Sequence, residues 1–160
     1  MTQKMDKSLI GAAGEHLVLS RLLSMGLLAA QAPRGVQKVD ILVNSLGGGE
    51  ATLIQVKTRS SRGRRGWTMN EKHEAIDDGD LFYCFVNLEP QHPLVHVIPA
   101  TVVAEVIRTG HQQWLDTPGR SGHAHNQTPM RLLDPSDKNQ PENWMDKYLE
   151  NWEPILNRGI

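Results

Sequence analysis

The fold is decided by residues 39–58, which read VDILVNSLGGGEATLIQVKT. Two aliphatic and β-branched runs, 39–43 and 51–58, flank a glycine-rich segment. Glycine adopts the positive φ angles that tight hairpin turns need, so the pattern predicts two antiparallel strands. With Gly47-Gly48 as a two-residue turn, paired residues are equidistant from it, and Asp40 lies opposite residue 55.

Polar side chains gather on one face of this predicted hairpin. Side chains alternate along a strand, which places Gln55 and Lys57 on the same face. The register adds Asp40 to that face, at cross-strand distances of about 5 Å. A slip of one residue would move Asp40 to the other face, so the grouping depends on the register. The alternatives are a polar solvent face and a strand-entry aspartate bonded to backbone amides.

A second carboxylate precedes the hairpin. Helical spacing of apolar residues predicts a helix over 9–25, with Ser8 as its N-cap and Gly26 just past its end. Glu15 lies in line with Val18 on the apolar, core-facing stripe. If this helix covers the polar face of the hairpin, Glu15 joins the group. A salt bridge at the helix edge is the alternative.

These groups suit metal-assisted hydrolysis of a phosphodiester. Mg²⁺ prefers oxygen ligands and binds through one or two carboxylates while keeping several waters. Glu15, Asp40 and the side-chain oxygen of Gln55 could supply such ligands. The ammonium of Lys57 could stabilise the negative charge of the transition state or orient the attacking water.

The pattern resembles the PD-(D/E)XK nuclease superfamily, through Gly14-Glu15, Val39-Asp40-Ile41 and Gln55-Val56-Lys57. It is similar to the Q-x-K branch, which includes Holliday-junction-resolvase-like proteins and some homing and restriction endonucleases. Val39 stands where the family often has proline. Gln55 replaces an acidic ligand and removes one negative charge. The resemblance covers about residues 9–98.

The resemblance implies a metal-dependent endonuclease that acts on DNA with Mg²⁺ or Mn²⁺. Its catalytic residues would be Glu15, Asp40, Gln55 and Lys57, and the first three would be the metal ligands. The superfamily also includes inactive relatives, so the alternative is a nuclease-fold module that binds nucleic acid or a protein partner without cutting.

The order of elements predicts an α/β fold with a restriction-endonuclease-like αβββαβ core, in which helices flank a central mixed sheet. We expect a single nuclease-like domain, 1–160, with a core at 9–98 and a C-terminal helical and loop extension at 99–160. Besides the elements above, the predicted segments are strands at 27–32, 81–88 and 94–98, helices at 70–76, 101–108 and 142–151, and a loop at 110–130.

A basic stretch follows the last site residue. Arginine clusters suit bidentate phosphate binding, and Lys72 on the short helix could face the same groove. The predicted nucleic-acid-binding residues are Arg59, Arg62, Arg64, Arg65 and Lys72. A solvated loop is the alternative. We expect Trp67 to pack in the core and His73 to be a surface histidine.

Composition sets limits on the function. The chain has 160 residues, is 39% hydrophobic and carries a net charge of −1, so it is no polycation. Its apolar runs are too short to span a membrane, and the lone Cys84 lies in an apolar run as a buried thiol. These features favour a cytoplasmic protein. An i, i+4, i+8 stripe at Trp144, Tyr148 and Trp152 favours core packing, with a homodimer face as the alternative.

Overall fold

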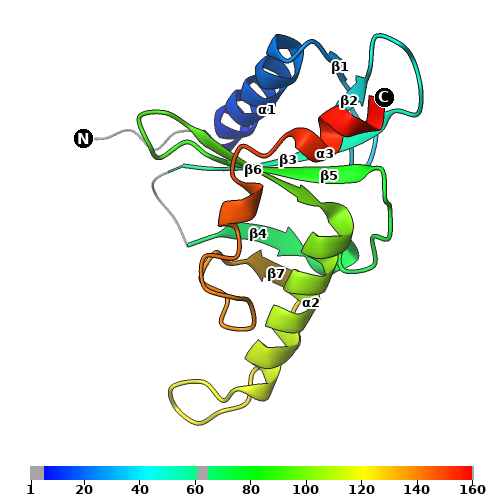
Figure 1. Ribbon diagram of the computed structural model, residues 1–160. Coiled ribbons are helices and arrows are strands. Elements are labelled where there is room, and N and C mark those ends of the chain that lie inside the picture. Colours follow the sequence, from blue (N-terminus) through cyan, green and yellow to red (C-terminus); the bar gives the residue numbers. More distant parts are fainter. Residues whose placement is uncertain (1–5, 61–64, 160) are drawn as a thin grey trace.

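The computed structural model describes residues 6–60 and 65–159 (Figure 1). The helices are α1 (Lys7–Ser24), α2 (Ala100–Asp116) and α3 (Glu153–Leu156), with 3₁₀ turns η1 (Glu71–His73), η2 (Asp146–Tyr148) and η3 (Asn157–Gly159). The strands are β1 (Leu28–Gln31), β2 (Ile41–Asn44), β3 (Thr52–Arg59), β4 (Trp67–Asn70), β5 (Leu81–Asn87), β6 (Leu94–Pro99) and β7 (Met130–Leu133).

Five strands form a central mixed sheet in the order β1-β2-β3-β5-β6. Strands β3 and β5 are parallel, and the other neighbouring pairs are antiparallel. Strands β4 and β7 form a separate antiparallel pair. Figure 1 shows α1 above the sheet and the β4–β7 pair below it. The predicted α/β class, with helices flanking a central mixed sheet, is confirmed.

The β2–β3 hairpin has the predicted register but a different turn. Ile41 pairs with Ile54, as the equidistance argument requires. The strands are joined by residues 45–51 rather than by two glycines, and the Gly48 N–H donates to the Ser45 carbonyl at 3.1 Å. The register is as predicted because the last paired residues, Val43 and Thr52, are equidistant from Gly47-Gly48.

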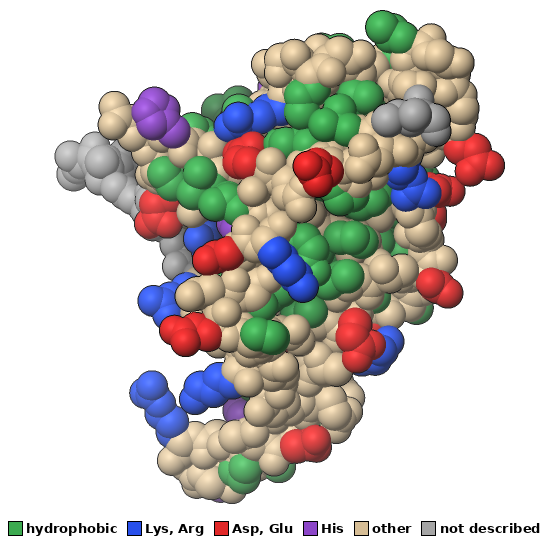
Figure 2. Space-filling view, in the orientation of Figure 1, with side chains coloured by type: hydrophobic (Ala, Val, Ile, Leu, Met, Phe, Trp, Pro, Cys, Tyr) green, Lys and Arg blue, Asp and Glu red, His purple; other side chains and the backbone are tan. Residues whose placement is uncertain are grey.

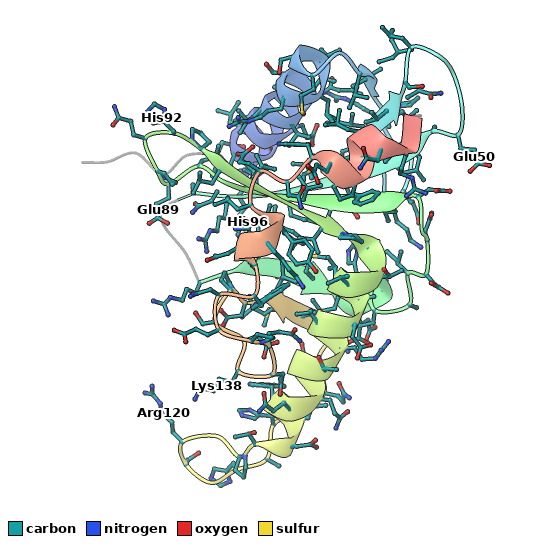
Figure 3. The ribbon with its side chains drawn as sticks, in the orientation of Figure 1. Glu50, Glu89, His92, His96, Arg120 and Lys138 are labelled. Atoms are coloured by element: carbon teal, nitrogen blue, oxygen red, sulfur yellow. The ribbon has the colours of Figure 1, made fainter. Side chains whose placement is uncertain are left out.

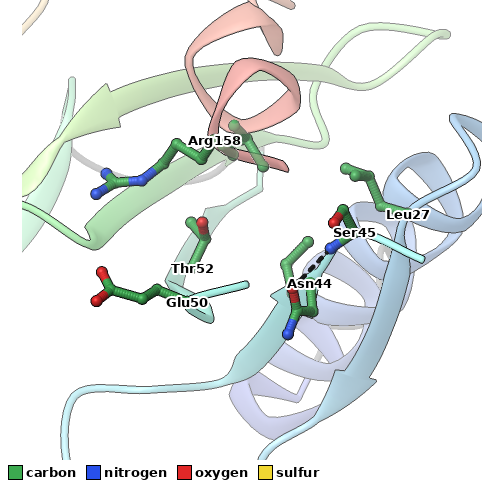
Figure 4. A pocket seen from close by; sticks show the side chains of 8 residues that line it. Leu27, Asn44, Ser45, Glu50, Thr52 and Arg158 are labelled. Atoms are coloured by element: carbon green, nitrogen blue, oxygen red, sulfur yellow. Dashed lines mark hydrogen bonds between the residues drawn. The ribbon is translucent and has the colours of Figure 1, made fainter. Parts of the chain in front are cut away.

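The loop end of the β2–β3 hairpin lies beside the C-terminal residues (Figure 4). Asn44 and Thr52 line a small hollow there with Arg158. The Asn44 side-chain oxygen accepts a hydrogen bond from the Ser45 N–H at 2.8 Å, and Arg158 forms an ion pair with Asp80. This hollow lies where β3 begins, whereas the predicted site residues lie further along β3.

Helix α1 begins at Lys7, two residues earlier than predicted. Its N-cap is Asp6, whose carboxylate accepts a hydrogen bond from the Ser8 N–H at 2.7 Å, so Ser8 is not the cap. Gly26, with φ of 82°, ends the helix as predicted, because glycine tolerates the left-handed conformation. Val18 and Leu22 are fully buried against the sheet.

The sheet separates two hydrophobic cores. The first core lies between the sheet and α1 and contains Ile54 and Val56 of β3. The second core lies on the other face, against α2, β4 and β7, and contains Tyr83 and Phe85 of β5. Because side chains alternate along β3, Gln55 and Lys57 lie on the face of the second core.

The C-terminal third differs most from the sequence predictions. Helix α2 continues to Asp116 and so occupies the start of the predicted 110–130 loop, and the unpredicted strand β7 begins at its last residue, Met130. The predicted helix at 142–151 is wrong, because Asn143 and Glu150 have φ of 56° and 48°, which an α-helix does not allow. Trp144 and Trp152 are buried, as the packing interpretation requires, but they lie in different cores rather than on one stripe.

Two smaller predictions concern single residues of the sheet. Trp67, 3% exposed, lies in the second core as expected, although the strand β4 that it begins was not predicted. Cys84 is a buried free thiol, also as expected.

None of the helices within residues 6–60 and 65–159 combines the length and apolar character that a membrane span requires.

Candidate active site

Asp40 is fixed to the edge of β3 by two backbone hydrogen bonds. Its N–H donates to the Ile54 carbonyl at 2.8 Å, and its carboxylate Oδ2 accepts from the Val56 N–H at 2.7 Å. Val56 stands between Gln55 and Lys57 in the sequence. The backbone therefore holds the Asp40 carboxylate beside the segment that carries both other hairpin residues of the predicted site.

Helix α1 covers the opposite face from the one expected. At Gly14 the helix approaches β3 so closely that an ideal Cβ would stand 1.9 Å from Thr58 Oγ1. Thr58 shares its face with Val56, on the side of the first core. The premise that α1 covers the face of Gln55 and Lys57 is therefore wrong, because the apolar stripe of α1 packs on the aliphatic face of β3.

Glu15 nevertheless comes close enough to Asp40 for their charges to interact. Burial raises the pKa of the Glu15 carboxyl, and the Asp40 charge raises it further. The two residues line one hollow, together with His16, Arg34 and part of the loop before β2. Two neighbouring carboxylates repel each other, and a bound cation relieves that repulsion.

Lys57 and Gln55 complete the predicted group. Burial lowers the pKa of the Lys57 ammonium, while the Asp40 carboxylate acts in the opposite direction. The side-chain oxygen of Gln55 is buried and has no hydrogen-bond partner in the described part of the chain. Leaving a buried acceptor unpaired costs about 1–3 kcal/mol, so this oxygen is available to a donor or a cation.

The donor set fits a hard divalent cation. No group of three or more His, Cys, Asp or Glu side chains in residues 6–60 and 65–159 is placed to hold a metal. The predicted ligands are instead two carboxylates, Glu15 and Asp40, and the amide oxygen of Gln55. Mg²⁺ commonly binds proteins through one or two carboxylates and keeps its remaining waters, which suits such a sparse set.

A buried hydrogen bond lies next to the site and was not predicted. His73 Nδ1 lies 2.6 Å from the Tyr83 hydroxyl, and both side chains are buried. Tyr83 is the direct partner of Gln55 across the β3–β5 pair. Burial lowers the pKa of His73 to about 4, and Lys57 contributes. The expectation of a surface histidine is wrong, since the buried Tyr83 hydroxyl needs a partner.

The structure describes three of the predicted nucleic-acid-binding residues, Arg59, Arg65 and Lys72. Arg59 lies over the Trp67 ring, 4.4 Å from its centroid. Arg65 is exposed and donates to Ser136 Oγ at 3.4 Å, and Lys72 is exposed on η1. Arg62 and Arg64 lie outside the described residues. On the face in Figure 2, basic side chains are interspersed with acidic ones rather than forming one continuous basic surface.

Comparisons with known proteins support the fold rather than a family. No protein-family model matches the sequence, and no curated protein matches it. The chain shares its mixed α/β fold with a solved structure.

This solved structure is that of the bacterial homing endonuclease I-Ssp6803I. It has a TM-score of 0.57 and 19% sequence identity, and the match covers 98% of this chain and 95% of that one. The likeness therefore extends beyond the expected core at 9–98 and includes the C-terminal third.

Proposed function

We propose that this protein is a metal-dependent endonuclease of the PD-(D/E)XK type that hydrolyses phosphodiester bonds in DNA. One observation carries the proposal. The Asp40 carboxylate, fixed by the Val56 N–H, interacts electrostatically with both Glu15 and Lys57. Carboxylates beside an ammonium are the groups that metal-assisted phosphodiester hydrolysis requires.

The carboxylate side of the site would hold Mg²⁺ or Mn²⁺. Glu15, Asp40 and the unpaired oxygen of Gln55 are the proposed ligands. A bound divalent ion supplies Lewis-acid polarisation of a phosphoryl oxygen and lowers the pKa of a coordinated water. Asp40 is the most firmly positioned of the three, because a backbone N–H already determines the direction of its carboxylate.

Lys57 is the proposed electrostatic stabiliser. Its ammonium can donate hydrogen bonds to a phosphoryl oxygen as negative charge develops there. Partial burial strengthens such an interaction, because the local dielectric is lower than that of water. The Asp40 carboxylate favours the charged form of the Lys57 ammonium and so opposes the lowering of its pKa by burial.

DNA is the proposed substrate for two reasons. The fold is shared with a homing endonuclease along almost the full length of both chains. In addition, Lys57 and Arg59 lie two residues apart on β3, and Arg65 follows this strand in the sequence. Phosphate contacts from such side chains position a protein on nucleic acid.

A cleavage assay tests the proposal. The protein is incubated with plasmid, linear duplex, single-stranded and branched DNA, in Mg²⁺, Mn²⁺ or EDTA. Lys57→Ala is prepared beside it, and Lys138→Ala is the matched control at an exposed lysine in the segment after β7 (Figure 3). We expect metal-dependent cleavage by the wild type and by Lys138→Ala, and none by Lys57→Ala.

The opposite result would favour a different function. If no DNA is cut in any metal, or if Lys57→Ala cuts as well as the wild type, the catalytic proposal fails. The glutamine at position 55 then favours a nuclease-fold module that binds DNA without cutting, because one negative ligand is missing. Circular dichroism and thermal unfolding of each variant separate loss of chemistry from loss of fold.

A further inference from the structure

A second hollow lies beside the carboxylate hollow, on the other side of the first turns of α1. Gly11 lines both, and an ideal Cβ there would have no heavy atom within 4 Å. The two hollows therefore meet at Gly11, which has no side chain to separate them. A ligand that extends along the surface of α1 could occupy both.

The second hollow is basic, whereas its neighbour contains the two carboxylates. Its cationic residues are Lys7, Lys57 and Arg59, and its hydroxyl residues include Ser60 and Thr68. No acidic residue of the described chain lines it. Three cations with hydroxyl donors and no carboxylate match the chemistry of an oxyanion such as phosphate.

The Arg59 side chain is already ordered by its contact with Trp67. Its guanidinium lies over the buried Trp67 ring, and the Trp67 indole N–H donates to the Val86 carbonyl at 3.2 Å. The Arg59 Nε is buried without a hydrogen-bond partner in the part of the chain that the structure describes. Because the side chain is already ordered, binding an anion there costs less conformational entropy.

The wall of the hollow depends on a glycine. Gly66 has φ of 85°, and an ideal Cβ would stand 2.2 Å from the Leu133 carbonyl oxygen of β7. The chain before β4 therefore passes directly against β7, which places Trp67 and Thr68 at the hollow. The second core thus determines the shape of this wall.

We propose that this basic hollow binds a backbone phosphate of the nucleic acid, adjacent to the phosphate that is cleaved. The proposal rests on the proposed nuclease function. Lys57 connects the two positions, since it lines the basic hollow and also interacts with Asp40 in the carboxylate hollow. Lys7 and Thr68 gain a role that no sequence motif indicated.

The test measures binding without cleavage. Fluorescence anisotropy of a labelled duplex in EDTA gives the affinity of the full chain across a range of salt concentrations. Each neutralised phosphate contributes about −0.9 to the slope of log K against log salt. We expect Lys7→Gln to make the slope shallower by about that amount, and Lys138→Gln to leave it unchanged. Thr68→Val should weaken binding several-fold with no change in slope.

An unchanged slope in Lys7→Gln, or an equal change in Lys138→Gln, would overturn the proposal. The source of the phosphate is resolved by the Trp67 indole resonance in ¹H–¹⁵N NMR spectra. A shift caused by duplex that excess inorganic phosphate does not reverse supports a backbone phosphate. Displacement of the duplex by inorganic phosphate at equal concentration would assign the hollow to free phosphate instead.

These results are separable from those on the nuclease itself. Cleavage that depends on Lys57, together with an unchanged slope in Lys7→Gln, would refute only the phosphate site. A shallower slope in Lys7→Gln, without cleavage of any DNA, would refute only the catalytic activity. Absence of both salt-dependent binding and metal-dependent cleavage in the wild type would refute both.

Discussion

Between pH 6.5 and pH 4, the buried His73 imidazole should make the folded state progressively less stable. Its pKa is lowered from 6.5 to about 4, chiefly by burial. As the pH falls through this window, the unfolded chain binds a proton that the folded imidazole does not. The free energy of unfolding therefore falls with pH, by about 1.4 kcal/mol per unit at most and about 3 kcal/mol over the window.

Urea unfolding at pH 7, 6, 5 and 4.5 measures this effect when the wild type is compared with His73→Gln. Other titrating groups, such as His96, whose pKa burial also lowers, act in both proteins and cancel in the difference. The stability advantage of the wild type at pH 7 should shrink by roughly 2–3 kcal/mol at pH 4.5. A constant difference, or an NMR titration of His73 near pH 6.5, would refute the reasoning.

Three further substitutions test other contacts. In an ordinary helix a Gly→Ala substitution stabilises the protein by about 1 kcal/mol. Gly14→Ala should instead destabilise it by about 1–3 kcal/mol in urea unfolding, because the new Cβ meets Thr58 Oγ1. Adding Thr58→Ala to this variant should partly restore the stability. Gln55→Glu should lower the melting temperature in EDTA by adding a buried charge, and Mg²⁺ should raise it again, whereas a melting temperature insensitive to Mg²⁺ would contradict the metal site. Arg131→Met leaves Glu74 without its buried partner and should cost about 3–5 kcal/mol in chemical denaturation; a loss below 1 kcal/mol would show that the ion pair contributes little.

The hairpin could be predicted from sequence because its signals are local. Alternating side chains determine the faces of β3, and the glycines centre the loop, so the pairing of Ile41 with Ile54 follows even though the turn differs. The same local signals place Asp40, Gln55 and Lys57 near one another. Whether these residues perform catalysis remains a prediction.

The side of the sheet covered by α1 could not be predicted in this way. Both faces of β3 contribute to a core, so a helix with one apolar stripe fits either face on pattern alone. The informative residue was Gly14, since glycine inside a helix often marks close packing against a neighbouring element. Its approach to Thr58 identifies the aliphatic face.

Other errors come from contacts between distant residues. The burial of His73 depends on Tyr83 and on the second core, neither of which its own neighbours in sequence reveal. The spacing of Trp144 and Trp152 imitates a helix. The positive φ of Glu150, which lies between them, interrupts any helix, and one tryptophan is buried in each core.

The pairing of β4 with β7 limits how this chain can be divided. Residues after 98 supply the only strand that pairs with β4 within the described chain, and they bury one tryptophan on each side of the central sheet. A shorter chain ending at residue 98 would expose the edge of β4 and leave Trp67 without its partner Leu133. The site therefore cannot be transferred with residues 9–98 alone. Grafting this segment into another protein would move the site residues without the later residues that pack against both faces of the central sheet.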